Sequence, residues 1–102
     1  MTTVQAFYLA LAAGNGDEAV RFIVPVKRDK GPFSRHAITR FYGGLAEPLT
    51  LQALTSAGPD TFRVRYTFVV RPSRRCDGEA LVQTVRMRNE NLIRSIKALN
   101  GC

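Results

Sequence analysis

Residues 61–71, with the sequence TFRVRYTFVVR, decide the fold because apolar and polar side chains alternate along them. One face would carry Phe62, Val64, Tyr66, Phe68 and Val70. The other would carry Arg63, Arg65, Thr67, Val69 and Arg71. A period of two is typical of a β-strand with one buried face. We therefore expect a sheet whose aromatic face is covered by a second layer.

One segment before residues 61–71 and two after them share this alternation, and turn signals separate all four. The segments are LTLQALTSA (49–57), EALVQTVRMR (79–88) and LIRSIKAL (92–99). The turns are GPD (58–60), PSRRCDG (72–78) and NEN (89–91). Short turns of Gly, Pro, Asn and Asp join antiparallel neighbours. The second half of the chain thus predicts a four-stranded antiparallel meander.

The first half has helical periodicity. Val4, Phe7, Tyr8 and Leu11 form an apolar stripe behind a cap at Thr2 or Thr3. A short second helix would start at Asn15 or Asp17, and a third, RHAITRFY, at Ser34. Helices followed by strands predict an α+β fold. We expect one domain, residues 1–102, with three N-terminal helices packed on a curved four-stranded antiparallel sheet.

The composition is strongly basic for a chain of this size. The 102 residues carry a net charge of +7, and the 15 basic residues outnumber the 8 acidic ones. A solvated basic surface explains this excess, and a polyanionic partner is the alternative. No apolar run approaches the roughly 18 residues that a membrane span needs.

The two cysteines, Cys76 and Cys102, are predicted to face each other. A turn at residues 89–90 or 88–90 makes the last two strands a hairpin. Counting outward from it brings Cys102 opposite Cys76, or within one residue of it. Opposed residues have Cα atoms about 4.5–5.5 Å apart, which suits a disulfide. Two free thiols in a cytosolic protein are the alternative.

A disulfide would indicate an oxidising compartment. The start, MTTVQAF, shows no signal peptide, which fits either a cytosolic protein or a mature domain whose leader has been removed. Because of the predicted disulfide, we expect the second, a periplasmic or secreted protein. We expect no metal site, because two cysteines need further ligands and His36 is the only histidine of the chain.

The layout resembles the NTF2-like superfamily, a cone-shaped α+β fold. The matching stretches are VQAFYLALAAGNGDEAVRFIVP (4–25), ITRFYGG (38–44) and the long strands that follow. The ending, CDGEALV (76–82) with LIRSIKALNGC (92–102), is similar to small secreted bacterial members. The resemblance implies a pocket between the helices and the concave sheet face. That pocket is an active site in some members and a binding cavity in others. A cystatin-like fold is the runner-up.

Catalysis and cofactors are not indicated. The eight acids fall at predicted helix starts, in loops or at strand edges, and His36 lies on the polar side of its helix. An isomerase would need an inward-facing carboxylate base, and a dehydratase-type member a His–Asp pair. We therefore expect no catalytic residue and no cofactor.

Two groups of residues are candidates for binding. Pocket candidates are Tyr8, Tyr42, Tyr66 and Gln83, with Ser95 beside them. Candidates for a basic outer sheet face are Arg63, Arg65, Arg71, Arg86 and Arg88, with Val82 and Thr84 between them. The loop VKRDKGPFSR (26–35) is a second basic cluster, solvated unless it rims the pocket.

These observations predict a non-catalytic binding domain of the bacterial cell envelope. Its candidate partners are a small apolar ligand, an acidic envelope or protein partner, and a second copy through the sheet face. A small isomerase- or dehydratase-type enzyme is one alternative. A cytosolic module that binds nucleic acid is another, although no aromatic residue interleaves the arginines.

Overall fold

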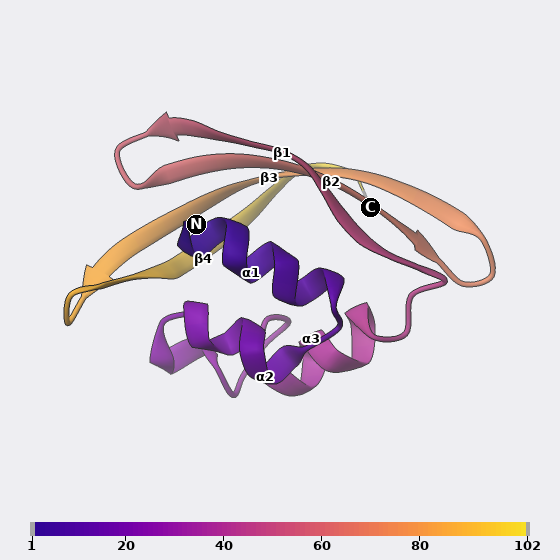
Figure 1. The fold of residues 1–102 in the computed structure, drawn as a ribbon, viewed down its shortest axis with the longest axis horizontal. Helices are drawn as coiled ribbons and strands as arrows, with labels where there is room; N and C mark the ends of the chain where they lie inside the picture. Colours follow the sequence, from indigo (N-terminus) through magenta and orange to yellow (C-terminus); the bar gives the residue numbers. More distant parts are fainter. Residues whose placement is uncertain (1, 102) are drawn as a thin grey trace.

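The computed structural model describes residues 2–101 and has two layers (Figure 1). The helical layer holds α1 (Thr3–Ala12), α2 (Gly16–Ala19) and α3 (Arg35–Tyr42), with the 3-10 turns η1 (Val20–Phe22) and η2 (Pro25–Lys27). The sheet holds β1 (Glu47–Gly58), β2 (Thr61–Val70), β3 (Arg74–Met87) and β4 (Glu90–Asn100). The predicted α+β class, helix order and antiparallel meander β1-β2-β3-β4 are confirmed.

Side-chain caps begin the three α-helices. Thr2 accepts a hydrogen bond from the Gln5 amide, Asn15 from the Glu18 amide, and Ser34 from the Ala37 amide. The first amide groups of a helix have no backbone acceptor within the helix, and these side chains supply one. Thr2, Asn15 and Ser34 are each among the caps predicted from sequence.

The helices lie on one face of the sheet, which arches over them (Figure 1). Val64 in β2, Ala80 and Val82 in β3, and Ile93 in β4 are almost fully buried against the helical layer. Phe7 and Leu11 of α1 are completely buried on the other side of the same core. The aromatic face of residues 61–71 is therefore the covered face, as predicted.

The last hairpin differs from the prediction in its turn and its register. Arg88 and Asn89 form the turn with φ of 50° and 67°, and Met87 pairs with Glu90. Two positive φ values are typical of a type I′ turn, which suits the twist of the strands. The turn thus lies one residue earlier than expected, and two register shifts follow it along β3 and β4. Strand β3 also begins at Arg74, inside the segment predicted as a turn.

Candidate functional site

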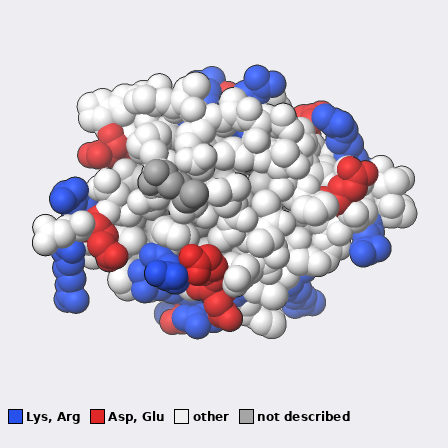
Figure 2. Space-filling view, in the orientation of Figure 1, with Lys and Arg blue, Asp and Glu red and all other residues white. Residues whose placement is uncertain are grey.

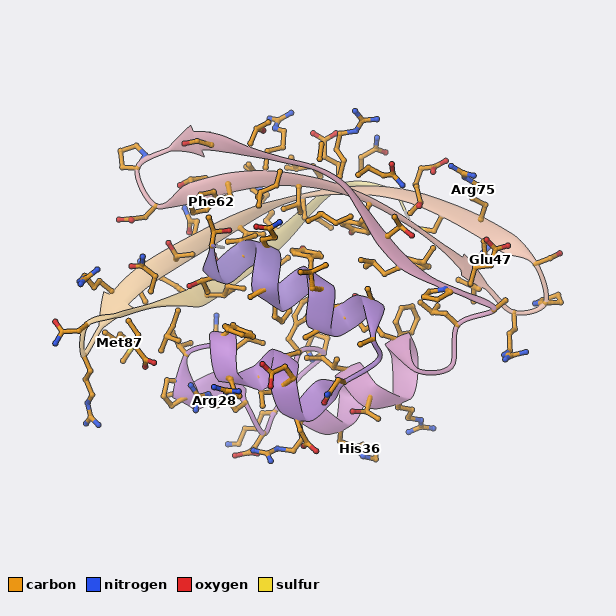
Figure 3. All side chains as sticks on the ribbon, viewed as in Figure 1. Arg28, His36, Glu47, Phe62, Arg75 and Met87 are labelled. Atoms are coloured by element: carbon orange, nitrogen blue, oxygen red, sulfur yellow. The ribbon has the colours of Figure 1, made fainter. Side chains whose placement is uncertain are left out.

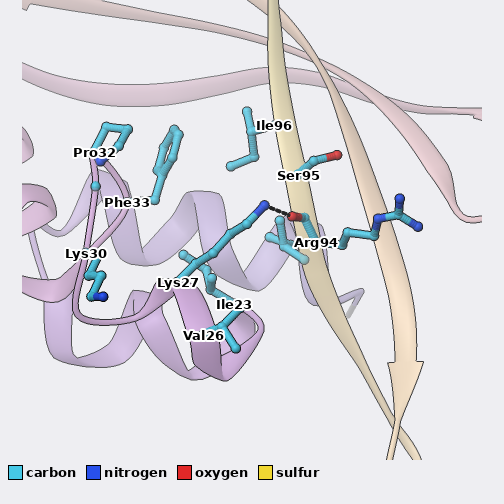
Figure 4. A pocket seen from close by; sticks show the side chains of 11 residues that line it. Ile23, Val26, Lys27, Lys30, Pro32, Phe33, Arg94, Ser95 and Ile96 are labelled. Carbon is cyan, nitrogen blue, oxygen red and sulfur yellow. Dashed lines mark hydrogen bonds between the residues drawn. The ribbon is translucent and has the colours of Figure 1, made fainter.

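An apolar cavity lies where the loop after α2 meets the edge of β4 (Figure 4). Its volume is about 380 Å³. Ile23, Phe33 and Ile96 supply apolar walls, and Val26 stands at the mouth with 81% of its surface exposed. Ligand sites typically measure about 300–1,000 Å³ and are mostly apolar, so this cavity has the dimensions of one.

Backbone contacts hold the loop against β4. Ile23 forms a parallel β-bridge with Ile93, and the Val24 amide donates to the Ile93 carbonyl at 3.0 Å. The Arg28 Nε atom donates to the Ile23 carbonyl at 2.8 Å and turns the loop back on itself. The loop then turns at Gly31, whose backbone φ of 81° lies in the left-handed region that favours glycine. One wall of the cavity is thus fixed to the sheet, and the other is a turn.

The predicted pocket tyrosines do not line this cavity; they pack together in the aromatic part of the core. Tyr8 stacks on Tyr66 with ring centroids 5.8 Å apart, and Tyr66 stacks on Phe68 at 6.1 Å. Tyr42 meets Phe68 edge-on at 6.4 Å. The spacing of these residues marked the inward faces correctly, but large rings on facing elements fill the space between them.

Burial raises the pKa of all three tyrosine hydroxyls, because a phenolate loses solvation there. The pKa of Tyr42 rises from 10.0 to about 12, through burial first and the neighbouring Tyr66 second. Burial also raises the pKa of Tyr8, with Tyr66 and Tyr42 adding to the effect. These groups stay neutral at physiological pH.

Gln83, the fourth pocket candidate, lies on the opposite face of the sheet. Its neighbours in β3, Val82 and Thr84, are buried, whereas Gln83 is exposed and accepts a hydrogen bond from the Ser95 hydroxyl at 3.1 Å. The prediction that Gln83 faces inward is therefore wrong, whereas Ser95 is half-buried and is among the residues that line the cavity. The opposed pairs Phe62–Val82 and Thr61–Gln83 give the physical reason, because paired residues share a face.

The predicted basic face is only partly assembled. Arg63 and Arg65 are exposed on the outer face of β2, as expected. Arg71 follows β2, and its Nε atom donates to the Gly44 carbonyl at 3.1 Å. Arg86 lies on the helix-facing side of β3, beyond the helical cover, and Arg88 is in the hairpin turn.

The assignment of Val82 and Thr84 to this outer face is wrong, since both are buried under the helices. Acidic side chains also balance part of the outer face. Arg63 pairs with Glu79 at 2.8 Å, and Arg75 pairs with Asp77 at 3.1 Å. Figure 2 shows both charge signs interspersed along the rim of the side in view. Both acids lie within β3, although Asp77 was predicted in a turn and Glu79 at the start of a strand.

His36 stands apart from the cavity. It is exposed on α3, and Figure 3 shows it on the side of that helix that points away from the sheet. Within residues 2–101, no three His, Cys, Asp or Glu side chains gather as a metal site would require.

Cys76 lies in β3 with 2% of its surface exposed and faces the core. Its predicted disulfide partner, Cys102, lies outside the described residues, so the bridge stays a prediction. The last described pair of the hairpin is Glu79 with Asn100. Gly101 then lies against Asp77 and Gly78, because a Cβ atom on it would come 2.6 Å from the Asp77 carbonyl oxygen. The chain therefore returns to the immediate neighbours of Cys76.

In comparisons with known proteins, no family model matches the chain, and no curated protein matches it either. None of the described helices has the length and hydropathy needed to span a membrane.

The basic loop at 26–35 can be recognised in the sequence, but its partner surface on β4 cannot. The available signal was the pair Pro32–Phe33 beside three basic residues, because an aromatic side chain in a charged loop needs an apolar neighbour. The ring of Phe33 also meets that of Phe7, with centroids 6.0 Å apart. Ile93 and Ile96, which line the cavity with it, lie about sixty positions further along the chain, and only the fold brings them together.

Proposed function

We propose that this chain is a non-catalytic, NTF2-like binding domain that holds a small apolar molecule between the 23–33 segment and β4. The cavity carries this proposal. Its walls are apolar, and its described lining residues include no Asp, Glu or His side chain, the groups that the isomerase- and dehydratase-type alternatives would need. Such a lining suits retention of a ligand better than its conversion.

A neutral fluorescent probe such as Nile red tests the proposal. We expect its emission to rise and shift to the blue when it enters the cavity. Val26→Ser removes an exposed apolar side chain from the mouth and should weaken probe binding without disturbing the fold. Leu9→Ser is the matched control, since Leu9 is also exposed, at 46%, but lies on α1 outside the cavity. Equal loss in both variants, or none in either, would contradict the proposal.

The outer sheet face supports a second element of the proposal, a homodimer. Leu81 is half-buried there between Arg63 on β2 and Lys97 on β4, its two opposed neighbours, although no element of the chain covers that face in Figure 1. Arg63 and Glu79 are opposite charges on the same face, so a second copy related by a two-fold axis would meet complementary charges.

We place the domain in an oxidising compartment, the periplasm or the extracellular space. This proposed location rests on the predicted Cys76–Cys102 bridge and on the position of Gly101 beside Asp77 and Gly78. It stands or falls with the bridge and is independent of the cavity.

A further inference from the structure

Two lysines face the apolar cavity. Lys27 reaches across its mouth, and its ammonium donates to the backbone carbonyl of Arg94 in β4 (Figure 4). Lys30 lines the loop side. Arg94 also contributes to the lining, but Figure 4 shows its guanidinium pointing away from the cavity. The cations available to a bound molecule are therefore the two lysines.

Within the described part of the chain, neither lysine is paired with a carboxylate. The five ion pairs there involve arginines only. Asp29, the residue next to Lys30, approaches Arg35 at 3.7 Å instead. Positive charge thus borders an apolar surface without a counter-charge, and a concave apolar wall strengthens the field that such charges produce.

The contact made by Lys27 leaves most of its binding capacity free. Arg94 falls in a register shift between the pairs Gln83–Ser95 and Thr84–Ile93, so it has no opposed residue in β3. Its carbonyl accepts from Lys27, which fixes the position of the ammonium. An ammonium has three donors, and two remain for a ligand.

From this arrangement we propose that the cavity selects a small amphipathic monoanion, an alkyl or aryl carboxylate of medium length. Its apolar body would lie against Ile23, Phe33 and Ile96, and its carboxylate would accept hydrogen bonds from Lys27 and Lys30. This inference rests on the proposed function and adds the ligand's charge. Apolar walls without cations would hold neutral and anionic ligands equally well, so the lysines determine the preference.

Isothermal titration calorimetry with three probes tests the inference: octanoate, 1-octanol and acetate. Octanoate and 1-octanol share the chain, and octanoate and acetate share the carboxylate. We expect octanoate to bind about 3- to 10-fold more tightly than 1-octanol, the range for two partly exposed charge contacts, and acetate to show no binding. The preference should shrink at high salt, because salt screens exposed charges.

Lys30→Gln should reduce octanoate affinity about 2- to 5-fold and leave 1-octanol affinity unchanged. Lys30→Arg should retain the preference because it keeps the charge. Lys97→Gln is the matched control, since Lys97 is an exposed lysine of β4 outside the cavity lining. Lys27→Gln should act like Lys30→Gln. If it disturbs the loop, Lys30→Gln alone decides the outcome.

The outcomes separate the two proposals. Equal binding of octanoate and 1-octanol would overturn the charge preference and leave the binding domain standing. Binding of acetate as tight as that of octanoate would also overturn the inference, because the apolar body would then contribute nothing. Binding of neither octanoate nor 1-octanol, together with no Nile red response, would remove the proposed function itself.

Discussion

The ring of Tyr66 lies directly over Gly78, its opposed neighbour on β3. A Cβ atom on Gly78 would come 2.3 Å from Tyr66 Cε1 and 2.5 Å from Cζ, closer than any real contact. The missing side chain at Gly78 thus makes room for the ring that stacks between Tyr8 and Phe68. One glycine in β3 therefore permits the aromatic stack that fills this side of the core.

We expect Gly78→Ala to destabilise the protein by about 1–3 kcal/mol, the usual cost of overpacking a filled core. Chemical denaturation of the two proteins measures the difference. Tyr66→Ala removes the ring, so Gly78→Ala in that background should cost much less. Equal costs in both backgrounds would show that the contact with the ring is not the cause.

Stability should fall as the pH rises above about 10. The pKa of Tyr42 is raised from 10.0 to about 12, and the pKa values of Tyr8 and Tyr66 are raised too. Below pH 10 both the folded and the unfolded chain hold these protons, and the stabilisation is fully present. Between pH 10 and about 12 the unfolded chain releases protons that the folded chain retains, so unfolding becomes more favourable.

Denaturant unfolding between about pH 9 and pH 11.5 measures this loss, and absorbance at about 295 nm follows phenolate formation. Tyr42→Phe removes one of the three groups and should make the dependence on pH shallower. A pH dependence as steep as that of the parent protein would contradict the role of Tyr42.

The outer sheet face gives a prediction about assembly. If two copies meet there, Leu81→Asp should lower the molar mass in solution from dimer to monomer, because it adds charge to the centre of the contact. Light scattering during size-exclusion chromatography measures the mass. Leu9→Asp, which adds the same charge at an exposed apolar position of α1, is the matched control. A monomeric parent protein would exclude this contact.

The two cysteines are open to a direct test. We expect the intact mass under non-reducing conditions to be lower by two hydrogens than the reduced mass. The bridge closes a loop and so lowers the conformational entropy of the unfolded chain. Reduction opens that loop and should destabilise the protein by about 3–4 kcal/mol on the chain-entropy model. Two free thiols after aerobic purification would remove the argument for an oxidising compartment.

Local signals determined much of this protein. Alternation along residues 61–71 fixed both faces of β2, and Thr2, Asn15 and Ser34 fixed where the helices begin. Each depends on side chains within a few positions of one another, because strand periodicity and helix capping are local effects.

Tertiary structure decided the site. The register of β3 follows from its pairing with β2, and it moved Val82, Thr84 and Gln83 to faces opposite those expected. The cavity joins Lys27 to the Arg94 carbonyl, 67 positions away along the chain. No local pattern predicts a contact between residues so far apart in the sequence. The contact forms because the bridge between Ile23 and Ile93 holds the loop on the edge of β4, and that edge exists only once the whole sheet has formed.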